Sequence, residues 1–323
     1  MNIVKPRTGI VGYGTYVPKQ RKTAEEIAQR RGDDALIATS LGVKQKSIPS
    51  ADEDTVTIAV EASLRAFSRF SIQKEKIGAL FIGSESHPYA VKPSGTVVAS
   101  ALGLSEQLAM ADLQFACKAG MQSLLVASAY VGSGMCELGM GIGADTAQAR
   151  DGDILEYTAG AGGGCVVIGN CDQHECIAEI LGSASIATDT PDFWRRPSFD
   201  HPSHAGRFTG TPAYFAHISK SVDVLLNKLD MKINEFALCG FHTPNAKFPA
   251  QIAKQLGVSK KQMLWSLPVL DVGNTYAGAI FLVLESIVDH AHAGDLALLA
   301  SYGSGAGSDA IALRILKDGK DAQ

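Results

Sequence analysis

Four polar side chains that adjoin apolar segments are the residues of this sequence best suited to chemistry, and Cys117 is the first. It precedes residues 118–131, a run of small and apolar residues typical of a buried helix. A thiol at the N-terminus of a helix feels the positive end of the helix dipole, which lowers its pKa. Cys117 is therefore a candidate nucleophile; the alternative is a small side chain of the core.

The other three residues are Glu85, His242 and Asn274. His242 follows an apolar segment, and α/β folds place active sites at the C-terminal ends of strands, where a histidine can polarise a carbonyl. Asn274 can donate an amide N–H to a thioester carbonyl, or can simply cap a helix. Glu85 would be a general base with a raised pKa in a dry pocket, or otherwise an exposed carboxylate in a loop.

The spacing of these four residues repeats. Glu85 and His242 are 157 positions apart, and Cys117 and Asn274 are also 157 positions apart (242 minus 85, and 274 minus 117). Such a repeat indicates two duplicated halves, and polar residues at equivalent positions then meet about a pseudo-two-fold axis. We expect all four side chains to share one pocket.

The elements that must position these residues alternate between strand-like and helix-like segments, which predicts layered α/β structure. The polar stretch 188–212 is predicted to be a surface loop or flap. We expect buried strands at 77–82, 165–169, 236–239 and 296–302, and helices at 55–70 and 219–229.

Two glycine-rich segments need separate interpretation. Residues 302–308 (YGSGAGS) do not match a dinucleotide-binding motif; their glycines let the backbone approach a reacting centre, so Gly303 and Ser304 are candidates for an oxyanion hole. Gly12-Tyr13-Gly14 is predicted to be a turn, and the Pro18 that follows excludes a dinucleotide-binding helix there.

Composition excludes several classes of protein. The 323 residues are 46% hydrophobic with a net charge of -4, so no basic surface for nucleic acid is expected. No apolar run is long enough to span a membrane, and residues 1–7 lack a signal sequence, so we expect a cytoplasmic protein. Six cysteines are too few for a disulfide scaffold. Cys171 and Cys176 with His174 form a poor zinc pattern, so no metal is expected.

As a group, these motifs resemble the thiolase superfamily, in the branch of ketoacyl-ACP synthase III and 3-hydroxy-3-methylglutaryl-CoA (HMG-CoA) synthase. The resemblance runs from residues 8–14 (TGIVGYG) through Cys117, 242–245 (HTPN) and Asn274 to 304–307 (SGAG). Residues 83–89 (GSESHPY) and 115–120 (FACKAG) are similar to the short archaeal/bacterial type of HMG-CoA synthase.

The resemblance implies a five-layered αβαβα fold made of two halves, residues 1–171 with the cysteine and 172–323 with the histidine and asparagine. It also implies a homodimer whose sheets continue across the interface. The implied reaction condenses acetyl-CoA, held as acetyl-Cys117, with acetoacetyl-CoA, a step of the mevalonate pathway of isoprenoid biosynthesis. In it Glu85 deprotonates the acetyl methyl group, His242 polarises the ketone, Asn274 positions a carbonyl, and no cofactor beyond the CoA thioesters is required.

Further expectations follow from the same resemblance. Lys247, and with it Arg195 and Arg207 in the polar stretch, are candidates to bind the CoA phosphates, although solvated surface charges are the alternative for the arginines. Possible partners are an acetoacetyl-CoA thiolase and a small zinc-ribbon/OB-fold protein. The chain is much shorter than eukaryotic members and lacks their long C-terminal additions, so a ketoacyl-ACP synthase III-like acyltransferase with a different acceptor stays an alternative. A second alternative is a non-catalytic scaffold subunit of a thiolase complex, although an idle subunit would not need all four polar residues.

Overall fold

A nine-stranded mixed sheet is the frame of the molecule in the computed structural model, which describes residues 6–147, 149–196 and 198–319. Its strand order is β11-β12-β13-β8-β1-β7-β6-β4-β5. The strands are β1 (Thr8–Tyr16), β4 (Ile77–Gly83), β5 (Ala109–Leu113), β6 (Leu138–Asp145), β7 (Gly162–Asn170), β8 (Ala178–Thr190), β11 (Leu238–Phe241), β12 (Leu296–Gly303) and β13 (Gly305–Ile315).

The same topology occurs twice in this sheet. In the first half β4 pairs parallel with β6, β6 antiparallel with β7, and β7 antiparallel with β1. In the second half β11, β12, β13 and β8 pair in the same order and with the same directions. The two halves join where β1 and β8 pair through only Gly9–Glu179 and Ile10–Ala178. The boundary expected between residues 171 and 172 falls in the turn between β7 and β8 and stays a prediction.

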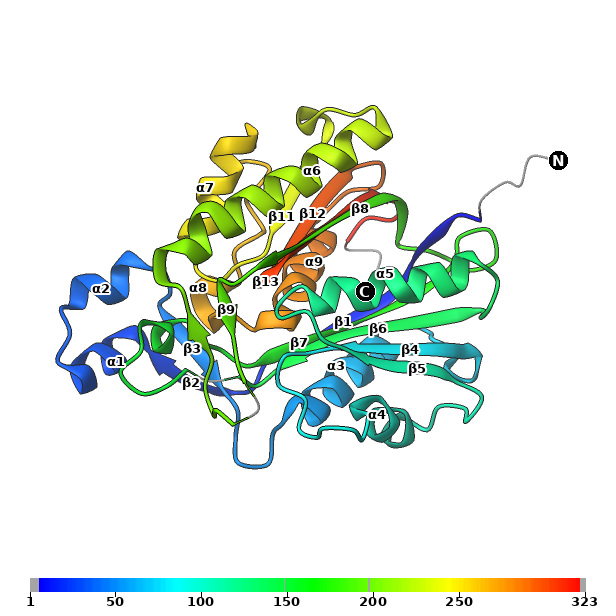
Figure 1. Cartoon of the computed structure of the whole chain (residues 1–323). Coiled ribbons are helices and arrows are strands. Elements are labelled where there is room, and N and C mark those ends of the chain that lie inside the picture. The colour runs from blue at the N-terminus through cyan, green and yellow to red at the C-terminus, as the bar shows by residue number, and fades with distance from the viewer. Residues whose placement is uncertain (1–5, 148, 197, 320–323) are drawn as a thin grey trace.

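The molecule has five layers, because two helices lie between the two halves of the sheet and further helices cover the outer face of each half (Figure 1). Helices α3 (Thr55–Arg69) and α4 (Ser94–Leu102) cover the outer face of the first half, and α6 (Phe215–Leu229) and α7 (Lys247–Leu256) cover that of the second. Helices α5 (Ala119–Gly132) and α9 (Ala279–His290) lie between the halves, where their apolar residues share one core with strands of both. The expected αβαβα fold is confirmed.

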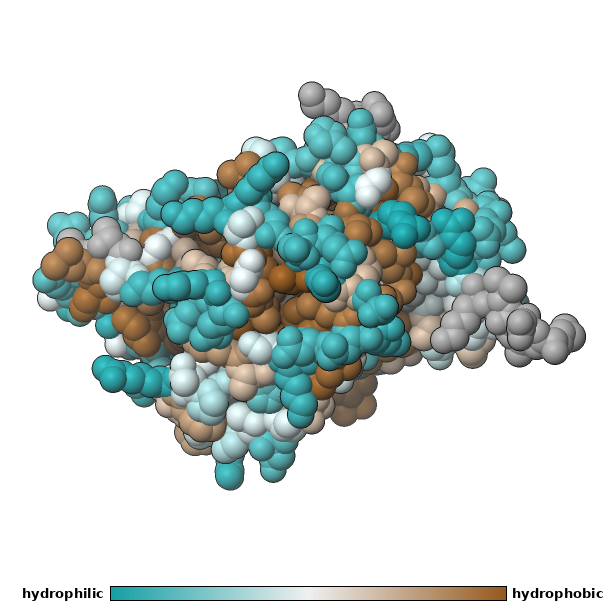
Figure 2. Space-filling model, turned by 90° about the horizontal axis from the view of Figure 1, so that it is seen from above, coloured by the Kyte–Doolittle hydropathy of each residue, from teal (hydrophilic) through white to brown (hydrophobic). Residues whose placement is uncertain are grey.

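The smaller elements lie outside the nine-stranded sheet. The strands β2 (Gln20–Thr23) and β3 (Gln45–Ile48) form one hairpin, and β9 (Phe193–Trp194) and β10 (Ser203–His204) form another. The short helices are α1 (Ala24–Arg31), α2 (Ala35–Ser40) and α8 (Val269–Val272). Hydrophobic and hydrophilic side chains are interspersed on the face shown in Figure 2, as on most folded proteins. No helix in the described ranges has the length and apolarity needed to cross a membrane.

Three expectations about elements need correction. Gly12-Tyr13-Gly14 is not a turn but part of β1; a Cβ at Gly14 would lie 2.5 Å from Ala66 N, so glycine is required there for the close packing of α3 on the strand. The stretch 188–212 is not wholly loop, because β8 extends to Thr190 and the β9–β10 hairpin follows. The strand expected at 236–239 begins two residues later, at Leu238, after a 3₁₀ turn.

Candidate active site

A cavity of about 670 Å³ lies where the two halves meet, and it brings together three of the four residues singled out by the sequence. Cys117 precedes α5, His242 follows β11, and Asn274 precedes a 3₁₀ turn (Tyr276–Gly278) that leads into α9. Ser304, in the turn between β12 and β13, lines the same cavity. The walls between these polar groups are largely apolar and aromatic: Leu41, Ile154, Leu155, Phe193, Tyr214, Phe215, Phe248, Tyr276 and Tyr302.

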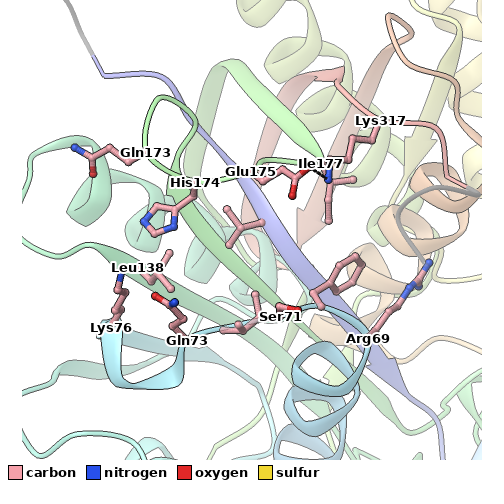
Figure 3. A pocket seen from close by; sticks show the side chains of 13 residues that line it. Arg69, Ser71, Gln73, Lys76, Leu138, Gln173, His174, Glu175, Ile177 and Lys317 are labelled. Carbon is pink, nitrogen blue, oxygen red and sulfur yellow. Dashed lines mark ion pairs between the residues drawn. The ribbon is translucent and has the colours of Figure 1, made fainter.

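A second cavity, of about 460 Å³, opens between the end of α3 and the β7–β8 turn (Figure 3). Its basic side chains are paired: Lys317 with Glu175 at 2.5 Å, Lys76 with Glu137 at 2.7 Å, and Arg69 with Asp289 at 2.6 Å. None of the residues predicted to act in chemistry lines it. The first cavity is therefore the candidate active site.

The turn before α5 presents the Cys117 thiol to the cavity. Ala116 has a φ of 43°, a left-handed conformation that residues other than glycine rarely adopt. On the other side of the turn lies Gly303, where a Cβ would overlap the Phe115 carbonyl oxygen and come 2.6 Å from Lys118 Cβ. The absence of a side chain at Gly303 thus lets the end of β12, and with it Ser304, approach the Cys117 turn.

Glu85, which follows β4, contacts the thiol from behind the cavity wall. The Cys117 Sγ–H donates to Glu85 Oε2 at 3.5 Å. Burial, and then the nearby Asp145 carboxylate, raise the pKa of Glu85 to about 8. A carboxyl group that titrates near neutrality is suited to general-base work, as the sequence interpretation required.

The expectation that the helix dipole lowers the pKa of Cys117 is wrong. Burial raises the pKa of this thiol well above its usual value, and the charges of Glu85 and Asp145 raise it further. A hydrogen bond from Asn274 opposes this effect without outweighing it. The thiol therefore keeps its proton in the resting site, and that proton points at Glu85.

Asp145, at the end of β6, is a buried carboxylate that sequence reasoning missed. Its Oδ1 accepts hydrogen bonds from Ser84 Oγ (2.6 Å), the backbone N–H groups of Glu85 (2.8 Å) and Ser86 (3.0 Å), and Ser86 Oγ (2.7 Å). Its Oδ2 accepts from Ala277 N–H at 2.8 Å. Asp145 thus links the backbone around Glu85 to the turn that follows Asn274. The available signal was an aspartate ending an otherwise apolar strand, 138–145.

His242 is 2% exposed and held through its backbone. Its N–H donates to Ala300 O at 2.8 Å, and its carbonyl oxygen accepts from the Tyr214 hydroxyl at 2.6 Å. The ring Nδ1 is buried without a hydrogen-bond partner in the described chain, and burial lowers the pKa of the imidazole to about 3. A neutral imidazole at the cavity wall can polarise a carbonyl through its ring N–H.

Asn274 is oriented by its own turn. Its side-chain Oδ1 accepts from Tyr276 N–H at 2.9 Å, which directs the amide NH₂ group away from that turn. Backbone hydrogen bonds from Asn274 N–H to Thr158 O (2.7 Å) and from Gly160 N–H to Asn274 O (2.9 Å) fix the chain on both sides. The side-chain amide is thereby available as a donor in the cavity.

Asp192 anchors the polar stretch to the glycine-rich turn and was also missed from the sequence. It is fully buried, its Oδ2 accepts from the Tyr302 hydroxyl at 2.5 Å, and its Oδ1 accepts from Gly305 N–H at 2.7 Å. One carboxylate therefore ties the segment before the β9–β10 hairpin to the backbone next to Ser304.

The three basic residues expected to bind phosphate lie at different places. Arg207 is exposed and lines the cavity. Lys247 and Arg195 are exposed and do not line it, although Asn245 and Phe248, on either side of Lys247, do. Within the described ranges no group of His, Cys, Asp or Glu residues could hold a metal ion, and Cys171 and Cys176 are free thiols.

Comparisons with known proteins give close relatives along nearly the whole chain. The hydroxymethylglutaryl-CoA synthase of Archaeoglobus fulgidus is 50% identical over 308 residues, which cover 95% of this chain and 89% of the relative. Those of Methanococcus maripaludis and Methanopyrus kandleri are also 50% identical, over 95% of this chain and 88% and 87% of their own lengths. Residues 226–315 match the family model described as 3-oxoacyl-[acyl-carrier-protein] synthase III C terminal.

Solved structures share the fold at lower identity. An HMG-CoA synthase complexed with CoA matches with a TM-score of 0.89 and 23% identity, over 98% of this chain and 84% of that one. MvaS in complex with 3-hydroxy-3-methylglutaryl coenzyme A gives 0.88 and 22%, over 99% and 86%. The 3-oxoacyl-(acyl carrier protein) synthase III of Pseudomonas aeruginosa gives 0.86 and 20%, over 96% and 99%.

Proposed function

The chain belongs to the hydroxymethylglutaryl-CoA synthase family, and we propose from this membership and from the site that it condenses acetyl-CoA with acetoacetyl-CoA. The observation that carries the proposal is the Glu85 carboxylate 3.5 Å from the Cys117 thiol, at a cavity that His242 and Asn274 also line. This arrangement places a nucleophile and two carbonyl-binding groups at one cavity, with a base of raised pKa in contact with the nucleophile.

In the first half-reaction Cys117 becomes acetylated. Its sulfur attacks the acetyl-CoA carbonyl, and the thiol proton passes to Glu85, the base toward which it already points. The backbone N–H groups of Cys117 and Ser304 stabilise the oxyanion that forms. The tetrahedral intermediate then collapses, CoA leaves as a thiolate, and the proton held by Glu85 neutralises the CoA sulfur.

In the second half-reaction the acetyl group becomes a carbon nucleophile. Glu85, again ionised, removes a proton from the acetyl methyl group, and the resulting enolate attacks the ketone of acetoacetyl-CoA. The neutral imidazole of His242 donates a hydrogen bond to the ketone oxygen, where negative charge develops, and Asn274 positions a thioester carbonyl. Glu85 returns the methyl proton to the alkoxide that forms, which gives the 3-hydroxyl group. Water then cleaves the enzyme thioester, which restores the Cys117 thiol and releases HMG-CoA with a free carboxyl group.

The basic residues have separate places in substrate binding. Arg207 is the strongest of the three candidates for a CoA phosphate, because it is the one that lines the cavity. Lys247, at the start of α7, and Arg195, in the hairpin segment, would meet phosphates outside the cavity proper. An alanine substitution at each position, tested for its effect on the KM for acetyl-CoA, would rank the three residues by their contribution to CoA binding.

Association with other chains is the finer part of the proposal. We infer a homodimer formed through β5, because this strand ends the sheet and has no neighbour on its outer side in the described chain. Complexes with an acetoacetyl-CoA thiolase and a zinc-ribbon/OB-fold protein, and a cytoplasmic location, stay predictions from the sequence.

The deciding experiment measures CoA release from acetyl-CoA plus acetoacetyl-CoA, with malonyl-ACP offered as a competing substrate. HMG-CoA formation that malonyl-ACP does not reduce is the expected result. Decarboxylation of malonyl-ACP in preference to HMG-CoA formation would support the ketoacyl synthase alternative. Incubation with acetyl-CoA alone should add an acetyl group to Cys117, and to no residue of Cys117→Ser; no acetylation in the wild type would favour the scaffold alternative.

A further inference from the structure

Lys118, the residue after the nucleophile, is buried at the N-terminus of a helix, which is an unfavourable position for a lysine. Lys118 is 2% exposed and is the N-cap residue of α5. Lysine is almost never fully buried without a partner. A cation at the N-terminus of a helix also opposes the helix dipole, which favours negative charge there. A buried lysine in this position therefore indicates a specific role for its charge.

The partner of Lys118 belongs to the other half of the molecule. Lys118 Nζ lies 2.9 Å from Oδ2 of Asp309, a fully buried residue of β13, and it also donates to Gln122 Oε1 at 2.7 Å. The ammonium group stands 4.2 Å from the centre of the Phe115 ring, over which it makes a cation–π contact. The ion pair thus joins the start of α5 in the first half to β13 in the second.

The pair connects the two backbone segments that meet at the candidate oxyanion hole. Cys117 immediately precedes Lys118, and Ser304 immediately precedes β13, in which Asp309 lies. The Cys117 turn contains the left-handed Ala116, a conformation that persists only when its surroundings hold it. Gly303 packs directly against Lys118, so the spacing of the two turns depends on the position of that lysine.

We propose that Lys118 and Asp309 are positioning residues that hold the N–H groups of Cys117 and Ser304 at the separation that an acyl oxyanion requires. The proposal rests on the acyl-transfer function inferred above, and it adds that this ion pair fixes the position of one half relative to the other at the site. It requires that loss of the pair impairs reactions that pass through a tetrahedral oxyanion. Reactions of the thiol that form no oxyanion should proceed as before.

The test replaces both charges at once, in Lys118→Met/Asp309→Leu, because an apolar pair is tolerated where a single buried charge is not. Two reactions of Cys117 are followed by mass spectrometry: acetylation by acetyl-CoA or p-nitrophenyl acetate, and alkylation by iodoacetamide. A displacement of about 1 Å in such a site costs about 10²-fold, so we expect acetylation to slow by that order while alkylation keeps its rate. If this double variant does not fold, Lys118→Gln/Asp309→Asn, which also leaves no buried charge but keeps polar groups, should likewise slow acetylation and not alkylation.

A matched control removes another ion pair that crosses the halves away from the cavity. Arg7 Nε and Glu179 Oε1 are 2.8 Å apart across the β1–β8 junction, and Arg7→Met/Glu179→Leu should leave both reactions unchanged. Equal slowing of acetylation and alkylation in the Lys118 variant, or normal acetylation, would overturn the proposal. If the wild-type protein accepts acetyl groups from p-nitrophenyl acetate but not from acetyl-CoA, the proposed substrate is wrong. The rates of acetylation by p-nitrophenyl acetate would then still test the role of the ion pair.

Discussion

At the scale of single residues, the site depends on three neighbouring acidic groups whose pKa values are all raised. Burial raises the pKa of Cys117, Glu85 and Asp145, and the carboxylates raise the pKa of the thiol further. Asp145 receives five hydrogen bonds that favour its ionised form. At neutral pH the Cys117 thiol therefore keeps its proton and Glu85 is mostly protonated, and these are the two groups that the chemistry uses.

Replacing Glu85 by glutamine should change two reactions in opposite directions. Glu85→Gln keeps the shape of the side chain but removes a negative charge that raises the pKa of Cys117. Alkylation of Cys117 by iodoacetamide at pH 7 should become faster, about tenfold for each unit by which the thiol pKa falls. Condensation, which needs the base, should slow by about 10²- to 10⁴-fold. Stopped-flow alkylation and product assays measure the two separately.

Either of two outcomes would contradict this assignment. Normal condensation in Glu85→Gln would show that another group removes the methyl proton. Equal slowing of acetylation, alkylation and condensation would assign Glu85 to the architecture of the pocket.

Condensation should depend on pH through Glu85. With a pKa of about 8, this group is mostly protonated below pH 8, so the rate should rise as the pH increases through that value. His242, whose pKa is about 3, stays neutral over the same range and adds no second limb. Asp145→Asn removes one of the causes of the raised Glu85 pKa, so the midpoint of the profile should move to lower pH, with reduced activity because an amide NH₂ cannot accept the hydrogen bonds that the carboxylate does.

The same pKa predicts a change in stability. The folded protein binds the Glu85 proton more tightly than the unfolded chain, so this contribution to stability is present at low pH and is lost as the pH rises through about 8. Thermal unfolding between pH 6 and 9 should show a smaller loss for Glu85→Gln than for the wild type. A rate profile that is flat across pH 8, together with identical unfolding curves, would contradict the assignment of this pKa.

At the scale of elements, the contact between the Cys117 turn and the β12–β13 turn should tolerate no added side chain. In Gly303→Ala the new Cβ would lie 2.6 Å from Lys118 Cβ and 2.9 Å from Lys118 N. Overpacking of this kind costs about 1–3 kcal/mol, and the displaced turn should slow acetylation of Cys117 by about 10²-fold. Thermal unfolding and the acetylation rate are the measurements.

A glycine of α5 serves as the control for this substitution. The Cβ of Gly132→Ala would make ordinary contact with Thr8 Cγ2 at 3.4 Å, and alanine favours a helix over glycine by about 1 kcal/mol. We expect unchanged acetylation and equal or greater stability. Acetylation at the wild-type rate in Gly303→Ala would show that the two turns can separate without effect on the oxyanion hole.

The sequence predicted the elements with strong apolar patterns and missed groups that act through backbone contacts. Residues 77–82 form one continuous apolar run, and β4 lies there. The repeated spacing placed Cys117, His242 and Asn274 at one cavity. Asp145 and Asp192 have no repeated spacing, and their partners are backbone N–H groups and hydroxyl groups distant in sequence, so the sequence did not single them out. The pKa of Cys117 could not be predicted from its helix alone, since burial raises it most, and the carboxylates that raise it further follow β4 and end β6.

At the scale of the whole molecule, β5 leaves one edge of the nine-stranded sheet open. The segment that holds Tyr89 and Val91 leads to Ser94, whose N–H donates to Oδ2 of Asp112 in β5 at 2.6 Å. Val91 is fully exposed with a φ of 72°, and Tyr89 is 54% exposed. Exposed apolar side chains beside an unpaired strand are typical of an interface between subunits.

We expect light scattering to give twice the 34.0 kDa mass of the chain, and Val91→Asp to reduce it to that of a monomer, because a charge would be buried at the interface. Leu264→Asp, at a side chain that is 64% exposed near the opposite edge, is the control and should stay dimeric. A monomeric wild type, or a dimeric Val91→Asp, would exclude the β5 edge as the interface.

The repeated topology has a consequence for the ancestry of the chain. Glu85 and His242 follow equivalent strands, and Cys117 and Asn274 precede equivalent helices, yet the paired residues differ in chemistry. Two identical copies would have carried the same residue twice, so the reaction became possible only after the copies ceased to be interchangeable. Either half alone would have the fold of one copy without the complete set of catalytic residues. Recombination that made the two copies identical again would remove part of that set and abolish the reaction.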